Sequence, residues 1–317
     1  SVNSLSNCCR LKSNIEDLGY YNSIGGTALE VGSVKVNTIN LARISYETKT
    51  EQEYLDVLKD RVVLCCQALD IVRGIIRRNI EKGLLPNYSL DIMHLDSQYN
   101  TIGIIGIYEA LQKFKHTKKD KLGYTSYTDA GIAFATKILA TINETKKAFA
   151  EDKDYMVNIE QIPGERAAYV LMQKDKFIFP KEKYELPLYG NQWIPLGVKT
   201  TLKDKIAISA VLDEACSGGS IAHINIDAPF NSFDTAWKML NYVADAGVEY
   251  FAFNLKISAC EKNHGFYGDT CPQCGGKVVT TYQRIVGFLV PEKTYSKERK
   301  AEFKLRDWFD VNGMQEI

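Results

Sequence analysis

Residues Cys260 to Leu289 read CEKNHGFYGDTCPQCGGKVVTTYQRIVGFL, and this stretch decides how the rest of the chain is interpreted. Its first part carries four side chains of the kind that bind metal ions, namely Cys260, His264, Cys271 and Cys274. Its last part is an apolar run that contains one glycine, Gly287. A small metal-binding knuckle directly before a glycine in an apolar segment is an uncommon arrangement, and both parts need an explanation.

The four ligand-type residues predict a structural zinc site. Cys271 and Cys274 enclose Pro-Gln, a spacing that lets two sulfurs face one ion, and the glycines that follow permit a tight turn. Cys260 and His264 complete a set of three thiolates and one imidazole, which closes a tetrahedral site without an open position. The alternative is a set of reduced cysteines in a turn. Removal of zinc should unfold the knuckle, because the binding energy of such an ion is local folding energy.

Taken alone, Gly287 indicates a bulge or a close backbone approach. The tail, however, resembles the C-terminus of anaerobic (class III) ribonucleoside-triphosphate reductases, where a cysteine-rich zinc site precedes an Arg-x-x-Gly-Tyr/Phe-Leu segment, here Arg284 to Leu289. The resemblance implies that Gly287 carries a stable Cα radical, as in other glycyl radical enzymes. A planar radical that is delocalised onto the flanking amides is least hindered where the carbon has no side chain.

One position departs from that family pattern. The family usually supplies its first zinc pair as Cys-x-x-Cys, whereas here Asn263 stands at the second cysteine position and His264 follows it. The departure leaves the identity of the fourth ligand open, although not the presence of a metal.

Two adjacent thiols, Cys8 and Cys9, lie among small and polar residues near the start, which predicts a loop. From the residues alone, they are two buried structural cysteines. The resemblance instead implies that Cys9, immediately before Arg10, is the family's thiyl-radical cysteine on a loop at the centre of a barrel. Cys8 occupies a position that is glycine in many relatives, and it could serve as a reductant.

Three further residues are candidates for substrate binding. Asn40 follows an alternating strand pattern that runs into a loop and resembles the family's VxxINLPRIA; otherwise it is a strand-end asparagine. Glu165 follows a strand and a sharp turn and matches the carboxylate of the family's TPxE segment; otherwise it is a helix-start glutamate favoured by the dipole. His223 is either a hydrogen-bonded core histidine or a substrate contact.

Periodic apolar residues predict helices at residues 51–80 and 129–151, and another at 235–246 that Asp234 caps. Cys65 and Cys66 fall on the first of these helices and are expected to be structural. Residues 100–111 resemble the family's GYIGIHETI, and they also suit any glycine-bearing buried strand that leads into a helix. Without a full GxGxxG, they do not indicate a dinucleotide site.

The composition excludes several classes of protein. The 317 residues hold 39 basic and 39 acidic side chains, so nothing indicates a protein that coats a polyanion. No apolar run approaches the roughly 20 residues of a membrane span. Eight cysteines, four of them in adjacent pairs, fit a reducing cytosol better than a disulfide framework, so we expect a cytoplasmic protein.

Helices alternate with glycine-bounded apolar strands, which predicts the α/β class. The resemblance implies the C-terminal half of a ten-stranded α/β barrel of the glycyl radical type, with a small zinc knuckle. The expected division is residues 1–255 for the barrel part, 256–280 for the knuckle, and 281–317 for the radical loop and tail. Because the chain starts at Ser1 without a methionine, we expect a fragment or a processed piece.

The function that the resemblance implies is anaerobic reduction of ribonucleoside triphosphates. The implied partners are a radical-SAM iron–sulfur activating protein, formate or a glutaredoxin- or thioredoxin-like reductant, the N-terminal half of the enzyme, and a second copy in a homodimer. One alternative is another glycyl radical enzyme, of the formate-acetyltransferase or dehydratase type, which lacks the knuckle. The other is a zinc-ribbon binding module without catalysis, against which the neutral charge counts.

Overall fold

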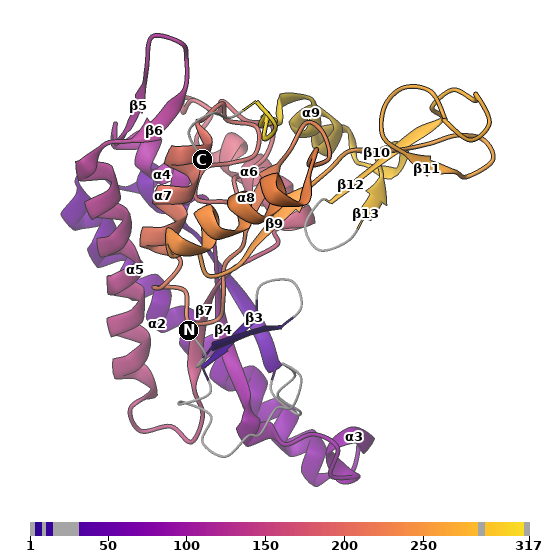
Figure 1. Cartoon of the computed structure of the whole chain (residues 1–317). Helices are drawn as coiled ribbons and strands as arrows, with labels where there is room; N and C mark the ends of the chain where they lie inside the picture. Colours follow the sequence, from indigo (N-terminus) through magenta and orange to yellow (C-terminus); the bar gives the residue numbers. More distant parts are fainter. Residues whose placement is uncertain (1–3, 8–10, 15–31, 285–288, 314–317) are drawn as a thin grey trace. The chain divides into compact units, whose positions relative to one another are not determined.

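The computed structural model of the chain describes residues 4–7, 11–14, 32–284 and 289–313 (Figure 1). The chain divides into two compact units. The first comprises residues 1–117, 127–162 and 212–220, and the second comprises residues 118–126, 163–211 and 221–317. The three predicted radical-chemistry residues, Cys8, Cys9 and Gly287, lie outside the described residues.

The first unit contains a parallel sheet in the order β3-β4-β7 and a separate antiparallel pair, β1 and β2. Its elements are β1 (Ser4–Asn7), β2 (Leu11–Asn14), β3 (Gly32–Asn40), α1 (Leu41–Glu47), α2 (Glu51–Glu81), α3 (Pro86–Ser89), the 3-10 helix η2 (Leu95–Ser97), β4 (Gln98–Ile105), α4 (Ile107–Lys113), α5 (Asp129–Ala150) and β7 (Val157–Gln161). Parallel strands connected by helices confirm the α/β class.

The middle strand, β4, is buried along its whole length, as expected for a parallel strand covered on both faces. Its Gly103 permits close packing, because a Cβ there would overlap the side chains of Ile162 and Thr38. Gly106 ends the strand with a positive φ of 83°, and α4 begins at the next residue. The predicted glycine-bearing buried strand that leads into a helix is therefore confirmed.

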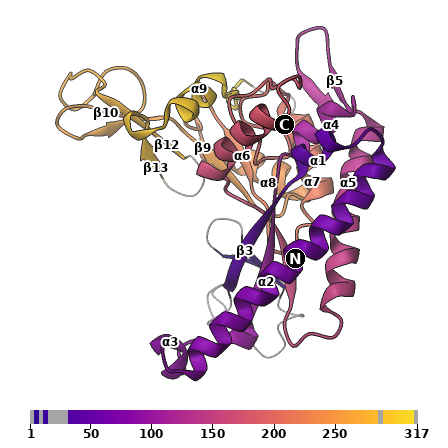
Figure 2. The same cartoon turned by 180° about the vertical axis from the view of Figure 1, so that it is seen from behind.

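Helix α2 confirms the longest predicted helix. Thr50 and Glu53 form a reciprocal capping box at its start, and its buried stripe packs against β3, β4 and α5. Figures 1 and 2 both show α2 and α5 side by side. Cys65 and Cys66 lie in this stripe, and burial raises the pKa of Cys65 to about 12 and that of Cys66 to about 11. Both are structural, as predicted.

The second unit contains a two-stranded parallel sheet, β8-β9, and a four-stranded antiparallel sheet in the order β11-β10-β12-β13. Its elements are α6 (Glu165–Ile178), α7 (Leu202–Leu212), β8 (Ala222–Asn225), α8 (Phe233–Asp245), β9 (Phe251–Asn254), β10 (Ile257–Ala259), β11 (Gly265–Phe266), β12 (Thr280–Arg284), β13 (Leu289–Pro291), the 3-10 helix η3 (Glu292–Thr294) and α9 (Lys297–Leu305). The pair β5 (Thr117–Lys119) and β6 (Thr125–Tyr127) connects the two units along the chain.

An apolar core holds the second unit together. It is formed by α7, α8, β8 and the segment after α9, through the buried residues Leu202, Ile206, Ala222, Ile224, Ile226, Met239, Val243, Val248, Phe309 and Val311. Phe309 pairs with Ile226 in an isolated parallel bridge. The tail of the chain is thereby fixed to the end of β8.

Two local expectations were wrong. The strand before Asn40 runs directly into α1 and not into a loop, since the Asn40 side chain accepts a hydrogen bond from the amide of Arg43 (3.1 Å) and starts the helix. Asp234 does not cap α8. Ser232 does, because its hydroxyl accepts from the amide of Thr235 at 3.0 Å, and Asp234 pairs with Lys238 one turn later.

The described strands and helices form a mixed α/β fold. The closure of a ten-stranded barrel stays a prediction. Among the described residues, no helix is long and apolar enough to cross a bilayer.

Candidate functional site

The four predicted metal ligands lie at one end of the antiparallel sheet. Cys260 follows the last residue of β10, and His264 precedes the first residue of β11. Cys271 and Cys274 lie in the connection from β11 to β12. Strand β10 pairs with β11 on one side and with β12 on the other. The knuckle therefore begins at the end of a strand that is hydrogen-bonded to β12.

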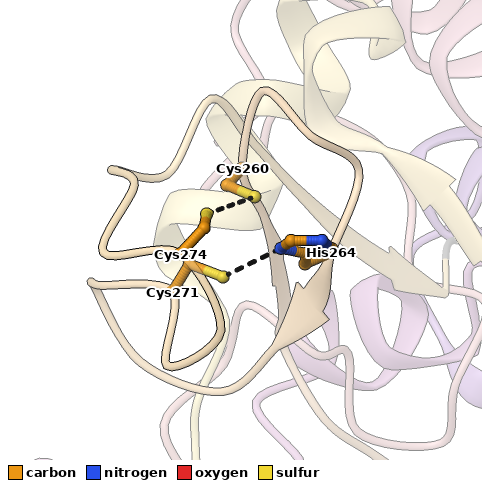
Figure 3. Close-up of side chains that lie close together, drawn as sticks. All are labelled: Cys260, His264, Cys271 and Cys274. Carbon is orange, nitrogen blue, oxygen red and sulfur yellow. Dashed lines mark hydrogen bonds between the residues drawn. The ribbon is translucent and has the colours of Figure 1, made fainter.

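The ligand atoms of these residues are close enough to hold one ion (Figure 3). All four lie within 4.8 Å of one another. The Sγ atoms of Cys260 and Cys274 are 3.6 Å apart, and Cys271 Sγ is 3.4 Å from His264 Nδ1. A tetrahedral zinc with ordinary bond lengths requires about 3.8 Å between two sulfurs and about 3.6 Å between sulfur and nitrogen. The sulfur separation is also far longer than a disulfide bond of about 2.05 Å.

The backbone shows how a histidine can take the position of the missing cysteine. Asn263 adopts a left-handed conformation (φ 59°), and its amide donates to the Cys260 carbonyl at 2.9 Å. In the second turn Gly275, with φ 68°, donates to the Cys271 carbonyl four residues earlier, also at 2.9 Å. At the first turn, the left-handed residue is followed directly by His264, whose Nδ1 lies 3.4 Å from Cys271 Sγ.

The pKa values of two thiols of the knuckle shift in opposite directions: the Gly276 amide lowers the pKa of Cys274, but hydrogen bonds with Cys271 and Cys260 outweigh it and raise that pKa above its ordinary value. Burial opposes ionisation of Cys260, but backbone amides of His264 and Lys262, together with the neighbouring thiols, hold its pKa below the ordinary value. The apolar support is small, with Phe266 and Val278 packed on the cysteines. A cluster of this size cannot order the surrounding loops by burial alone, so the donor set fits a structural ion.

The segment that contains Gly287 is held at both of its ends. β12 and β13 are antiparallel, with Arg284 opposite Leu289 and Gln283 opposite Val290. The four residues between these strands lie outside the described part of the chain. The pairing means that the segment begins and ends at the Arg284–Leu289 end of the β12–β13 pair, whereas Cys260 adjoins the other end of β12, where Ala259 pairs with Thr280.

The substrate-binding candidates occupy different elements. Asn40 lies at the junction of β3 and α1 in the first unit. Glu165 is the first residue of α6 in the second unit, directly after Gly164, whose φ is 67°; the Glu165 side chain is not among the described ones. The strand, sharp turn and helix predicted around it are confirmed, whereas the roles of Asn40 and Glu165 in substrate binding stay predictions.

His223, the third candidate, is buried on β8 with 2% of its surface exposed. Its Nδ1 lies 3.0 Å from Asn254 Nδ2, within hydrogen-bond distance. Its backbone amide donates to Gln192 Oε1 at 2.9 Å. The histidine is therefore a hydrogen-bonded member of the core, and a substrate contact in addition stays a prediction.

Sequence reasoning missed two buried polar groups of the second unit. The first is an amide network in which Asn225 Oδ1 accepts from both Asn254 (3.4 Å) and Gln283 (3.3 Å). The second is the ion cluster of Arg299 and Glu302 on α9 with Arg306, the residue that follows this helix. Glu302 lies three residues after Arg299 and four before Arg306, a spacing that predicts ion pairs. Because such pairs are normally exposed, the spacing does not indicate that these side chains are buried.

Comparison with known proteins was made over the whole chain. The family described as anaerobic ribonucleoside-triphosphate reductase matches residues 1–309. A curated protein of that name from Haemophilus influenzae is 22% identical over 286 residues, which cover 80% of this chain and 39% of the relative.

Solved structures of the same kind are more similar. A structure described as anaerobic ribonucleotide reductase has a TM-score of 0.86 and 43% identity, over 92% of this chain and 47% of that one. The Thermotoga maritima enzyme with glycerol in its active site gives 0.82 and 43%, over 90% and 47%. Its complex with dATP and CTP gives 0.81 and 43%, over 89% and 46%. The chain thus spans less than half the length of these relatives.

Proposed function

Because the chain belongs to the anaerobic ribonucleoside-triphosphate reductase family, we propose that it forms the catalytic C-terminal part of an enzyme that reduces ribonucleoside triphosphates by glycyl and thiyl radical chemistry. The observation that carries the proposal is the family match over residues 1–309. The Thermotoga maritima relative was solved with dATP and CTP, which supports nucleoside triphosphates as the ligands.

In the proposed reaction, an activating protein of the radical-SAM type removes a hydrogen atom from the Cα of Gly287. Gly287 then takes the thiol hydrogen of Cys9, so that the radical passes to sulfur. The thiyl removes the 3′ hydrogen of the ribose, which eases loss of the 2′ hydroxyl as water. Formate or a dithiol protein, with Cys8 as a candidate local thiol, supplies the reducing electrons. Exclusion of water and oxygen protects these intermediates.

Two groups of this chain have supporting roles. Cys260, His264, Cys271 and Cys274 would hold a zinc ion, which would supply structure and not redox chemistry, because four protein side chains are available as ligands. Asn40, Glu165 and His223 bind substrate. The expected division of the chain and the homodimer belong to the same proposal.

The metal cluster supports this proposal over its two rivals. A glycyl radical enzyme of the formate-acetyltransferase or dehydratase type lacks a knuckle before its glycine, whereas here the metal-ligand cluster is followed by β12 and then by the segment with Gly287. A zinc-ribbon module without catalysis does not account for a family match that extends over both units.

Electron spin resonance on the whole protein tests the proposal. After anaerobic activation, the wild-type protein should show a carbon-centred radical with splitting from one α hydrogen, and that splitting should collapse when the glycine is deuterated. G287A should give no signal, and C9S should keep the radical but lose turnover. Retention of the same signal in G287A would end the assignment.

A further inference from the structure

The ion cluster at the end of α9 is formed by Arg299 and Glu302 of the helix and by Arg306 directly after it, and it is buried although all three side chains are charged. The side chains are 9%, 7% and 0% exposed, respectively. Arg306 donates to both oxygens of Glu302, from Nε at 2.9 Å and from Nη2 at 3.1 Å. Arg299 donates to the same carboxylate at 3.1 Å. Buried ion pairs often add no stability over an apolar core, so the cluster calls for a role beyond stability.

Arg306 connects this cluster to β12. Its remaining nitrogen, Nη1, donates to the backbone carbonyl of Arg284 at 2.9 Å. A guanidinium is a rigid planar fork, so the two bonds to Glu302 fix the direction in which Nη1 points. Arg284 is the last residue of β12, and its carbonyl belongs to the peptide bond that begins the segment with Gly287.

The neighbouring residue of β12 is held equally well. The hydroxyl of Tyr295 donates to the carbonyl of Gln283 at 3.1 Å, and the Gln283 side chain donates to Asn225 on β8 at 3.3 Å. Gln283 is 1% exposed. The last two carbonyls of β12 therefore each accept a side-chain hydrogen bond from the tail of the chain.

We propose that Arg306 is a positioning residue at the end of β12: Glu302 aligns its guanidinium, and its bond to the Arg284 carbonyl fixes the last strand residue before the segment with Gly287. The inference rests on the proposed function. Hydrogen-atom transfer between Gly287 and a thiol requires close approach, and a misplacement of about 1 Å in such a geometry can cost about 100-fold in rate. If the cluster served stability alone, its substitution would not change the turnover rate per radical-bearing chain.

The first test needs no radical. Trypsin cleaves after Arg284 only when that carbonyl leaves Arg306, and the product is a new N-terminus at Ile285. R306Q should release it about tenfold faster than wild type, because a hydrogen bond from a charged donor is lost. R306K keeps the charge, so it should fold, but one ammonium cannot replace the fork, and cleavage should again be faster. The matched control is R299Q, which removes a guanidinium from the same carboxylate and should be cleaved as wild type is. If trypsin cleaved all three variants after Arg284 at the wild-type rate, the proposal that Arg306 holds the end of β12 would be overturned.

The second test uses the activated whole protein, with spins per chain and turnover per spin measured separately. R306Q and R306K should keep their zinc and lose about tenfold or more in turnover per spin. R299Q should keep wild-type turnover per spin whatever its thermal stability. Turnover per spin unchanged in R306Q and R306K, or reduced equally in R299Q, would overturn the positioning role. A wild-type protein without a radical on Gly287 would overturn the proposed function, and the trypsin test would still decide whether Arg306 anchors β12.

Discussion

Lys205 gives a prediction whose sign changes with pH. This lysine lies on α7 with 5% of its surface exposed, and its Nζ donates to the Ile194 carbonyl at 3.3 Å. Burial lowers its pKa from 10.5 to about 8, against a smaller opposing effect of Asp307. The folded chain therefore contains a costly buried cation at neutral pH, and the substitution K205M removes it.

The magnitude follows from the difference between the two pKa values. Below pH 8 the lysine is charged in the folded and the unfolded chain. Between pH 8 and 10.5 the unfolded chain binds a proton that the folded chain does not, so the free energy of unfolding rises with pH by a total of about 3 kcal/mol. K205M lacks this rise and also loses the bond to Ile194, worth about 1 kcal/mol. At pH 7 the variant should be more stable than wild type by about 2 kcal/mol, and by pH 10 it should have lost that advantage.

Urea unfolding of wild type and K205M at a series of pH values from 7 to 10 measures this difference. Titration of other groups cancels in the comparison, since both proteins share them. K203M is the matched control, because Lys203 lies on the same helix and is exposed; it should change the unfolding free energy by only a few tenths of a kcal/mol. A difference between K205M and wild type that does not vary with pH would refute the reasoning.

Two further predictions concern a ligand and a buried cation. H264A should lose most of its bound zinc while H264C keeps it, as measured by metal analysis and by the visible spectrum of the cobalt-substituted protein; an unchanged zinc content in H264A would exclude the histidine as a ligand. Arg73 is 1% exposed, donates to the carbonyls of Gln98 (2.9 Å) and Leu95 (2.7 Å), and lies 4.5 Å from the ring of Tyr155. R73M should lower the free energy of unfolding by about 3 kcal/mol because both carbonyls become unpaired, and a loss below about 1 kcal/mol would contradict this account.

The parts of the fold that the sequence predicted are those that local chemistry controls. The apolar stripe of α2, the glycine after β4 and the Gly164 turn before α6 each leave a local pattern, and each lies where expected. The metal ligands could be predicted because their spacing reflects the reach of two turns around one ion. His264 in place of a second cysteine was harder to judge, since it depends on the left-handed conformation of Asn263.

What the sequence did not reveal depends on contacts between distant residues. Arg306 and Arg284 are 22 positions apart, and Gln283 and Asn225 are 58 apart, so no periodic pattern links them. Ser232 and Asp234 are both good helix caps, and only the start of α8 decides between them. The pairing of barrel strands is likewise a long-range property that single-strand patterns do not specify.

The burial of the structural cysteines has a practical consequence for chemical labelling. Cys65, Cys66 and Cys216 are at most 4% exposed, and Cys260, Cys271 and Cys274 are committed to the knuckle. Alkylating reagents attack thiolates, and they react slowly with thiols that are shielded or metal-bound. In the folded, zinc-loaded protein, these six thiols should therefore resist a brief alkylation pulse, and a chelator should make the three knuckle cysteines reactive while Cys65, Cys66 and Cys216 stay protected.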